Sequence, residues 1–404
     1  MVYIKREIEA DLQRWLFERE IMAIRGARQA GKTTLLMKLK ERLIEKGIDG
    51  KNIIYLSFED DIQRIAFEQN PIKFVNSYLG TEDLYLLLDE VQYVKDVGKK
   101  LKLVFDSFKK VKIIMTGSSS FDLTNLGKYL VGRIIFFDLH PFSFLEFLRA
   151  KGERYERIYG EYKFDFQDKN LEKNPFVEEL NTLLKEYLTY GAYPRIILAD
   201  LDKKEELLRN MFITYIEKDI VSLYGNKNRD EIVKLMQLLA STQGIIKYES
   251  ICIDIKVKFN ELKKILSILQ DSFTISIVKP FHKNLVTELK KNPKIYFIDY
   301  GIRNHLAEKI NFDVLYENFV YNELSRKNKV TYWRTTAKTE IDFVVQTKEN
   351  LIAVEVKTVP KITRALRSFI DAYKIQTALV VNLNETKKDK INGCDVFSLP
   401  FVCL

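Results

Sequence analysis

Residues 21–34, with the sequence IMAIRGARQAGKTT, restrict the fold more than any other stretch of the chain. A short apolar run, Ile21 to Ile24, precedes a loop that matches G-x-x-x-x-G-K-[ST], the Walker A pattern. Its two glycines permit turns that let backbone N–H groups point inward and cradle phosphate oxygens. Lys32 would place its charge near the β- and γ-phosphates, and Thr33 would supply a hydroxyl ligand for Mg²⁺. We therefore predict that ATP binds to Gly26, Ala27, Arg28, Gln29, Ala30, Gly31, Lys32, Thr33 and Thr34.

A second stretch, LYLLLDE at residues 84–90, predicts a partner strand for that loop. A continuously apolar strand is typical of a parallel sheet that is covered on both faces. The strand ends in two acids, which is the Walker B pattern. We predict that Asp89 holds Mg²⁺ through water and that Glu90 orients and deprotonates the attacking water.

A further predicted strand, residues 111–115, ends in the polar sequence TGSSS. A side chain at this end would lie between the two Walker strands and could contact the γ-phosphate. Ser118 is the first candidate for this role and Thr116 the second, and a plain Gly/Ser turn is the alternative. Arg133, which precedes a strand at 134–138, is a candidate arginine finger or sensor. Arg28 competes for that role, and an ordinary surface arginine explains Arg133 equally well.

The composition is that of a soluble globular protein, with 46% hydrophobic and 30% charged residues. No apolar run approaches the ~20 residues that span a bilayer. The charged residues 1–15 do not resemble a signal peptide. We therefore expect a cytoplasmic protein without a membrane partner. The net charge of +9 suits a nucleic-acid partner, although a lysine-rich surface explains it as well.

The motifs together resemble a family of AAA+-superfamily ATPases of archaea and bacteria. The resemblance rests on GARQAGKTT, LLLDEVQ, MTGSSS and LVGR followed by LHPFSFLEFL. YGAYP at residues 190–194 and YFIDYG at residues 296–301 are similar to further signatures of that family. The resemblance implies a P-loop sheet with an additional strand, a helical lid and a C-terminal domain of unknown function. It implies no substrate.

Residues 228–280 predict the element order of a winged helix. Helical segments at 232–240, 248–253 and 259–270 precede a strand at 273–278. Lys263 and Lys264 lie on the third helix, and Lys258 just precedes it. Residues 225–291 contain 12 Lys/Arg and 7 Asp/Glu residues. Docking in the major groove of DNA with lysine–phosphate contacts is one interpretation, and a protein-interaction module is the other.

A third group of candidate residues lies near the C-terminus. Glu317 lies on a predicted helix at 315–326, and a hairpin at 340–347 and 351–358 carries Asp342, Glu355 and Lys357. A turn at 348–349 sets Asp342 opposite Glu355, whereas a turn at 349–350 sets it opposite Lys357. Either register gathers the three hairpin side chains on one face. The three carboxylates would hold Mg²⁺, and Lys357 would position water or stabilise developing charge.

With a helix near 362–374 and strands at 378–383 and 396–399, this order resembles the PD-(D/E)xK nucleases, in particular their Holliday-junction-resolvase-like branch. An amphipathic hairpin with alternating charge is the alternative.

These patterns predict an α/β protein in four parts. They are a P-loop ATPase core with a parallel sheet (1–140), a helical lid and connector (141–224), a winged-helix-like domain (225–290) and a restriction-endonuclease-like α/β domain (291–404). The predicted function is an Mg²⁺-dependent ATPase that binds and processes DNA, branched or junction DNA included, with metal-dependent cleavage by the last domain. One alternative is an ATP-driven switch that binds DNA or a protein without cutting. Another is a signalling ATPase that acts on proteins alone. Homo-oligomerisation is left open.

Overall fold

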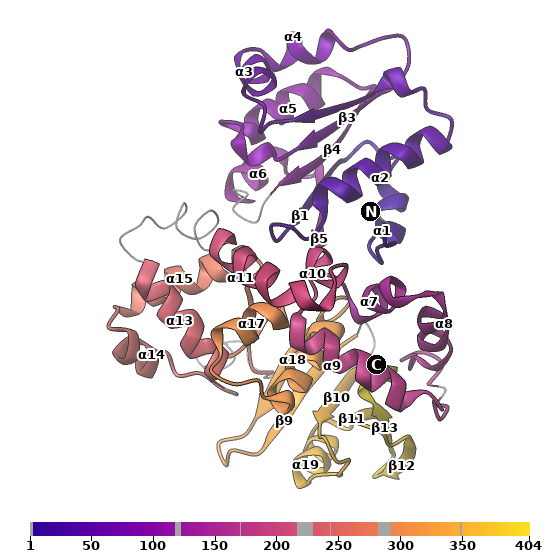
Figure 1. Ribbon diagram of the computed structural model, residues 1–404, viewed down its shortest axis with the longest axis vertical. Coiled ribbons are helices and arrows are strands. Elements are labelled where there is room, and N and C mark those ends of the chain that lie inside the picture. The colour runs from indigo at the N-terminus through magenta and orange to yellow at the C-terminus, as the bar shows by residue number, and fades with distance from the viewer. Residues whose placement is uncertain are drawn as a thin grey trace. The chain divides into compact units, whose positions relative to one another are not determined.

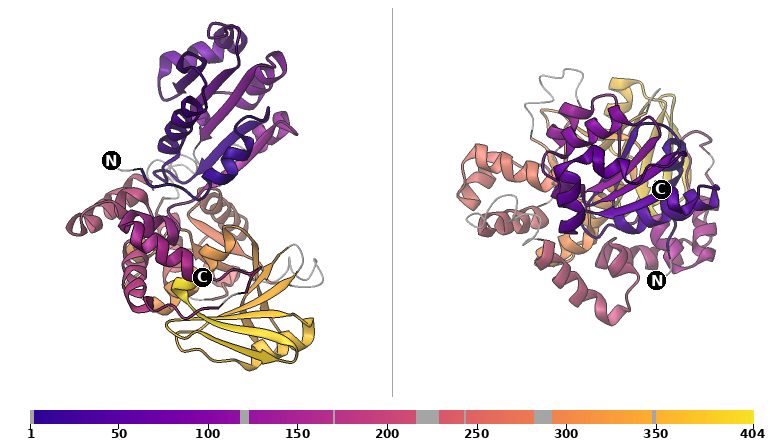
Figure 2. Two further views of the ribbon diagram at one scale, coloured as in Figure 1. Left: turned by 90° about the vertical axis from the view of Figure 1, so that its right-hand side faces the viewer. Right: turned by 90° about the horizontal axis from the view of Figure 1, so that it is seen from above.

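The structure is a computed structural model that describes residues 3–117, 123–169, 171–215, 229–242, 244–281, 292–347 and 350–404. The chain divides into two compact units (Figure 1, Figure 2). The N-terminal unit comprises Lys5–Pro141 and Asp271–Phe273. The C-terminal unit comprises Met1–Ile4, Phe142–Gln270 and Thr274–Leu404. In the described part of the chain, no helix is both long and apolar enough to cross a membrane.

The N-terminal unit is built on a five-stranded parallel sheet with the strand order β2-β3-β4-β1-β5. Two of its strands, β3 and β4, are buried along their whole length, as the apolar run of β3 predicts and although β4 also contains Lys112 and Thr116. Strand β4 lies between the strands that carry the two Walker motifs, β1 and β3, which confirms the additional-strand arrangement. The strands are β1 (Ile21–Gly26), β2 (Ile53–Ser57), β3 (Leu84–Asp89), β4 (Val111–Gly117) and β5 (Ile134–Leu139).

Helices cover both faces of this sheet (Figure 1). Helix α2 (Lys32–Glu45) packs on β1, β3 and β4 through its buried leucines. On the other face, four helices share one hydrophobic core with the sheet. They are α3 (Asp61–Gln69), α4 (Pro71–Asn76), α5 (Val97–Ser107) and α6 (Leu123–Leu130). Helix α1 (Glu9–Trp15) precedes β1. The sheet is therefore the covered middle layer that a parallel sheet requires.

The C-terminal unit contains a six-stranded mixed sheet with the order β12-β13-β11-β10-β9-β8 (Figure 2). Strands β8 (Lys329–Arg334), β9 (Glu340–Gln346) and β10 (Leu351–Val356) are antiparallel neighbours. Strands β10, β11 (Thr377–Asn382) and β13 (Cys394–Pro400) run parallel, and β12 (Lys387–Ile391) closes one edge antiparallel to β13. Helix α18 (Phe312–Ser325) covers one face and α19 (Arg364–Tyr373) the other.

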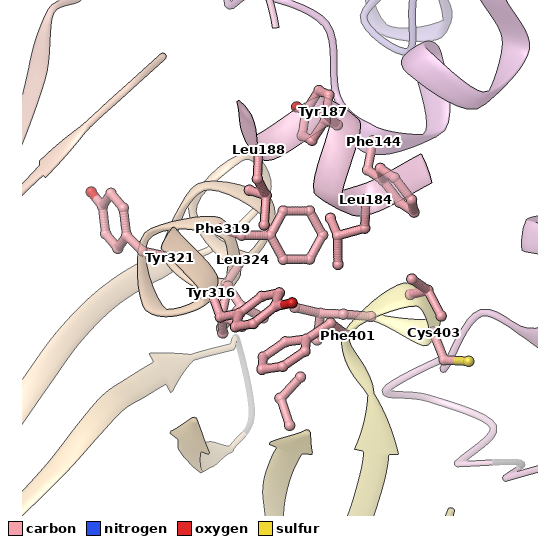
Figure 3. Close-up of a cluster of buried hydrophobic side chains, with 14 of the residues drawn as sticks. Phe144, Leu184, Tyr187, Leu188, Tyr316, Phe319, Tyr321, Leu324, Phe401 and Cys403 are labelled. Atoms are coloured by element: carbon pink, nitrogen blue, oxygen red, sulfur yellow. The ribbon is translucent and has the colours of Figure 1, made fainter. Parts of the chain in front are cut away.

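More helices pack on the α18 side of this sheet. They include α7 (Phe144–Lys151), α8 (Glu153–Tyr162) and α9 (Val177–Tyr190). Figure 3 shows side chains of α7 and α9 meeting those of α18 and the chain end. The rings of Phe144 and Phe319 lie 5.7 Å apart, and Tyr316 stacks on Phe401 at 4.5 Å. These helices lie within the predicted helical lid and connector, an assignment that stays a prediction. Their apolar faces are buried in a core shared with the C-terminal sheet.

Three helices and a strand pair form a further part of this unit. Helices α13 (Arg229–Ser241), α14 (Tyr248–Ile255) and α15 (Phe259–Asp271) precede the antiparallel strands β6 (Ile275–Val278) and β7 (Lys294–Phe297). Ile245, between α13 and α14, forms an isolated bridge with Lys294. The element order agrees with the predicted one, and its assignment as a winged helix stays a prediction.

The two sequence signatures at residues 190–194 and 296–301 meet in the structure. They join the C-terminal end of α9 to α17 (Tyr300–Leu306), beside α10 (Pro194–Ile197) and α11 (Lys204–Tyr215). Asp299 is 3% exposed, and its carboxylate accepts hydrogen bonds from the N–H groups of Ala192 at 2.6 Å and Ile302 at 2.8 Å. This carboxylate therefore caps α17 and holds the chain that leaves α9.

The glycines of the two signatures are required by close backbone contact. Gly191 has a φ of +87°, and a Cβ there would lie 2.6 Å from Oδ1 of Asp299. A Cβ on Gly301 would lie 2.3 Å from the carbonyl oxygen of Tyr190. These positions explain the signatures as packing requirements.

Candidate functional site

The predicted phosphate-binding loop connects β1 to α2. Gly26 ends the strand, where a Cβ would lie 2.1 Å from the carbonyl oxygen of Leu139. Gly31 is the N-cap of α2 with a φ of +98°, a conformation that favours glycine. Lys32 is 5% exposed, and its Nζ donates to the carbonyl oxygens of Gly26 and Ala27 at 3.1 Å each. The ammonium group therefore lies against the loop backbone, beside the helix N-terminus where phosphates bind.

Asp89, the last residue of β3, is 3% exposed and accepts hydrogen bonds from hydroxyl groups of three elements. Its Oδ2 accepts from Thr33 at 2.8 Å and from Tyr55 at 3.0 Å. Its Oδ1 accepts from Thr116 on β4. Burial, assisted by the Asp89 charge, raises the pKa of Tyr55 to about 12, so this phenol stays a donor at neutral pH. The structure thus brings Thr33 and Asp89, the two predicted Mg²⁺ ligands, into direct contact.

Glu90 follows Asp89 in the left-handed conformation, with a φ of 55°. Its N–H donates to Oγ1 of Thr116 at 3.2 Å, and its carboxylate accepts from Gln92. Non-glycine residues in this conformation are uncommon and cluster at functional sites. Through its hydroxyl group, Thr116 contacts both acids of the Walker B pair. It lies at the strand end that was predicted to carry a γ-phosphate sensor. Ser118, the first candidate for that role, lies outside the described residues.

These groups fit a nucleotide with Mg²⁺. The loop backbone and Lys32 supply positive charge and donors for phosphate oxygens. The Thr33 hydroxyl and the Asp89 carboxylate, 2.8 Å apart, are oxygen ligands of the kind that Mg²⁺ prefers. Glu90, partly buried at the same strand end, is placed to act on water beside a bound phosphate.

The two candidate arginines have different positions. Arg28 is half-buried within the loop itself. Arg133 precedes β5, whose first residue pairs with Ile21 at the start of β1. The loop follows the other end of β1, roughly 20 Å away along the strand. Arg133 forms an ion pair with Asp106 at 2.9 Å. This placement does not favour a role for Arg133 toward nucleotide in its own domain. A role toward a neighbouring molecule, and the role of Arg28, stay predictions.

Sequence reasoning missed two residues of this site, Tyr55 and Arg6. Arg6 is 4% exposed and donates to the carbonyl oxygens of Ala30 at 2.9 Å and His140 at 2.6 Å. It therefore ties the loop to the segment that follows β5. A lone arginine in a charged segment gives no sequence signal for such a contact. Tyr55 could have been found, because it lies on a strand that neighbours β3.

In the C-terminal unit, β9 and β10 pair in the first of the two predicted registers, the one that sets Asp342 opposite Glu355. Val354 pairs with Phe343, and continuing the register by one residue sets Asp342 opposite Glu355. Nζ of Lys357 lies 3.2 Å from Oδ2 of Asp342. The structure therefore brings Asp342 and Lys357 together on the hairpin.

Glu355 is directed toward α19. Its Oε1 accepts a hydrogen bond from Thr363, the N-cap of that helix. Its Oε2 is buried without a hydrogen-bond partner among the described residues. Burial raises the pKa of Glu355 to about 7, although the Thr363 bond and the Lys357 charge oppose the rise. Burial thus favours the protonated form of this carboxyl group.

Glu317 on α18 contacts Lys294, a buried lysine of β7. Nζ of Lys294 lies 3.0 Å from Glu317 Oε1, 2.8 Å from Glu340 Oε1 and 4.0 Å from Asp342 Oδ1. Tyr296 also donates to Glu317 Oε1, at 2.6 Å. Burial alone would lower the pKa of Lys294, but the carboxylates of Glu317, Asp342 and Glu340 outweigh it and raise the pKa above its usual value. Lys294 therefore stays charged and links Glu317 to Asp342.

This arrangement does not fit the predicted magnesium site. Within the ranges that the structure describes, no group of three or more His, Cys, Asp or Glu side chains is arranged to hold a metal ion. The ammonium of Lys294 lies between Glu317 and Asp342, and Glu355 is bonded to Thr363 instead. The ion-pair cluster centred on Lys294 therefore does not favour the predicted metal set of Glu317, Asp342 and Glu355, which stays a prediction.

The lysines predicted to contact DNA are accessible. Lys258, Lys263 and Lys264 are exposed at the start and along the outer side of α15. The opposite side of the helix buries Leu262, Ile265, Leu266 and Leu269. Nζ of Lys263 lies 4.6 Å from the ring centroid of Phe259, which is 41% exposed. This part of α15 therefore presents charge together with an aromatic ring.

Three protein-family models match parts of the chain. Residues 18–148 match a family described as AAA domain. Residues 181–313 and 312–402 match two families that are each described as a domain of unknown function, DUF8612 and DUF4143.

Relatives align along nearly the whole chain. An uncharacterized protein of Haemophilus influenzae is 27% identical over 397 residues, which cover 93% of this chain and 92% of that protein. An uncharacterized protein of Mycobacterium tuberculosis is 23% identical over 399 residues, which cover 94% and 80%. A solved Walker-type ATPase of Pyrococcus abyssi aligns over 75% of this chain and 96% of that one, with 15% identity and a TM-score of 0.47. The AAA-domain match lies mostly on the N-terminal unit, and this match and the loop geometry support an ATPase function for that unit.

Proposed function

We propose that this ATPase requires Mg²⁺ and couples ATP hydrolysis to DNA binding by the C-terminal unit, without cutting the DNA. The proposal of Mg²⁺-dependent ATP hydrolysis rests on the hydrogen bonds that Thr33, Tyr55 and Thr116 donate to Asp89 beside the loop. The proposal that the DNA is not cut rests on the buried Lys294, whose ammonium group lies between Glu317 of α18 and Glu340 of β9.

The residues of the N-terminal unit divide the work of hydrolysis. The loop backbone and Lys32 hold the phosphates, and Thr33 and Asp89 would hold Mg²⁺, which supplies charge neutralisation when bound. Glu90 orients the attacking water and accepts its proton. Thr116 bonds both Asp89 and the backbone of Glu90, so it keeps the metal ligand and the base in register.

The support for DNA binding lies in the C-terminal unit. The three-helix and strand-pair order of α13–α15, β6 and β7 is that of a winged helix, in which the third helix enters the major groove. The third helix here is α15, with exposed Lys263 and Lys264. Such lysines would contact phosphates and so give affinity without sequence specificity.

The test is the salt dependence of DNA binding. Each phosphate contact contributes about 0.9 to the log–log slope of affinity against salt. Replacing Lys263 and Lys264 by glutamine should therefore lower that slope by roughly 2 units and abolish any stimulation of ATP turnover by DNA. The matched control replaces Lys173 and Lys309, which are exposed elsewhere in the same unit, and should leave the slope nearly unchanged. An unchanged slope in both variants would favour a protein-interaction role for α15.

Metal-dependent DNA cleavage is the second candidate, because Asp342 contacts Lys357 and lies opposite Glu355. Supercoiled, linear and branched DNA should be incubated with the protein and Mg²⁺ or Mn²⁺, with and without ATP. Cleavage that is lost in Asp342→Ala and kept in Lys32→Ala would replace the non-cutting proposal. No cleavage of any substrate would support it.

A further inference from the structure

The acidic cluster of the C-terminal unit contains a cation of its own. We infer that Lys294 is the resident counter-ion of Glu317, Glu340 and Asp342, and that it excludes divalent metal ions from this cluster. The inference concerns the acids alone, so it holds or fails independently of ATP hydrolysis and of DNA binding.

The first argument is the position of the ammonium group. The side chain of Lys294 is 2% exposed, and its Nζ lies within 3.0 Å of oxygens from both Glu317 on α18 and Glu340 on β9. Asp342 Oδ1 lies 4.0 Å away on the same side. A divalent ion that bridged Glu317 and Asp342 would have to take the space that this ammonium fills.

The second argument is the balance of charge. The carboxylates of Glu317, Glu340 and Asp342 face three cationic side chains. Besides Lys294, these are Lys357 at 3.2 Å from Asp342 and Arg334 at 3.7 Å from Glu340. Each of these three carboxylates therefore has a cationic partner before any metal arrives, and a divalent ion would be repelled by a buried ammonium in a medium of low dielectric constant.

The third argument is that Lys294 is fixed by its surroundings. Its backbone pairs with Val278 of β6 and forms a bridge with Ile245. Its ammonium lies 5.6 Å from the ring centroid of Tyr332 and 5.8 Å from that of Phe343. A lysine held at its backbone and enclosed by rings cannot leave as an exposed lysine does, because withdrawal would leave unpaired carboxylates behind.

The test measures Mn²⁺ binding without nucleotide, by electron paramagnetic resonance and by the shift of the melting temperature. The wild type and Asp342→Asn should bind Mn²⁺ equally, because the cluster holds none in either. Lys294→Met should bind Mn²⁺ at least about tenfold more tightly than the wild type and be stabilised by it. The double variant Lys294→Met/Asp342→Asn should lose this gain in Mn²⁺ affinity. The variant Lys294→Arg should show no gain, because it keeps the positive charge.

Lys294→Met leaves buried carboxylates uncompensated and can fail to fold for that reason. The variant Lys294→Met with Glu340→Gln removes one cation and one anion, so it keeps the net charge and leaves Glu317 and Asp342 for the metal. It should fold and gain the Mn²⁺ site. The inference is overturned if the wild type binds an Mn²⁺ ion that Asp342→Asn loses. It is equally overturned if the folded charge-balanced variant gains no site.

Discussion

Replacing Asp299 by asparagine should remove a pH dependence from the stability of the C-terminal unit. Asp299 is 3% exposed, and burial raises its pKa from 3.8 to about 6, although backbone N–H groups such as those of Ala192 and Ile302 oppose the rise. Between these two pKa values the folded state keeps a proton that the unfolded state has released. The free energy of unfolding therefore falls as the pH rises from about 4 to about 6.

The size of the effect follows from the two pKa values. A rise of about 2 units corresponds to a loss on the order of 3 kcal/mol over the whole range. Roughly 1 kcal/mol of this loss falls between pH 5 and pH 7, where the folded-state carboxyl itself titrates. Asparagine does not titrate, and its oxygen can still accept the 2.8 Å bond from the N–H of Ile302. Its amide nitrogen cannot accept the bond from the N–H of Ala192, so the variant should be less stable at every pH. It should nevertheless lack this part of the pH dependence.

The assay is urea unfolding followed by tryptophan fluorescence. The chain has two tryptophans, Trp15 in the N-terminal unit and Trp333 in the C-terminal unit. In a Trp15→Phe background, fluorescence reports on Trp333 alone. The matched control is Asp200→Asn. That carboxylate is exposed, and the Lys203 bond lowers its pKa, so its contribution has the opposite sign.

The deciding quantity is the free energy of unfolding of the protein with its native Asp299 minus that of the Asp299→Asn variant, measured at pH 5, 6 and 7. The reasoning requires this difference to fall as the pH rises. A difference that stays constant would refute the argument that burial raises the pKa of Asp299. Constancy is the result expected for Asp200→Asn, because a carboxyl group with a lowered pKa is ionised in both the folded and the unfolded state from pH 5 to pH 7.

Three further predictions concern the N-terminal unit. Lys32→Ala should abolish nucleotide binding, whereas Glu90→Gln should keep binding and stall turnover, because it removes the base and keeps the shape; wild-type turnover in Glu90→Gln would place the base elsewhere. Gly26→Ala should weaken binding of a fluorescent ATP analogue by more than about tenfold, because its Cβ would lie 2.1 Å from a backbone oxygen of Leu139, and near-normal affinity would show that the loop can shift at little cost. Lys112→Met should lower the free energy of unfolding of this unit by about 1–3 kcal/mol in urea titrations, because Nζ of Lys112 donates to three backbone carbonyls within residues 15–20. An unchanged unfolding midpoint would mean that water satisfies these carbonyls in the variant.

The N-terminal unit could be predicted from sequence because its signals are local. The loop pattern is contiguous, and the apolar run that forms β3 is buried at every position. The position of Thr116 between the Walker strands followed from the strand order that the motifs implied. The motifs could not reveal contacts made by residues outside them. An example is Arg6, which precedes α1 and donates a hydrogen bond to the loop carbonyl of Ala30.

The C-terminal unit was less predictable because its signals are distributed. The sequence KKDKI of β12 lacks apolar alternation, and such lysine-rich strands are typical of sheet edges, where their charges discourage further pairing. The predicted lid helices were amphipathic, but amphipathicity does not say which core a helix joins. Lys294 looks like a surface residue in the sequence, because the acids that compensate it come from α18 and β9.

Asp89 and Asp342 differ in the partners of their carboxylates, and this difference supports the proposal that one binds a metal ion and the other does not. Asp89 accepts its bonds from the hydroxyls of Thr33, Tyr55 and Thr116, which orient the carboxylate without neutralising it. Asp342 instead contacts the ammonium of Lys357 and faces that of Lys294. A hydroxyl can exchange its donor role for coordination when a cation arrives, whereas an ammonium has no lone pair and must be displaced. An aspartate on a strand is therefore a better candidate for a metal ligand where hydroxyl groups contact it than where ammonium groups do.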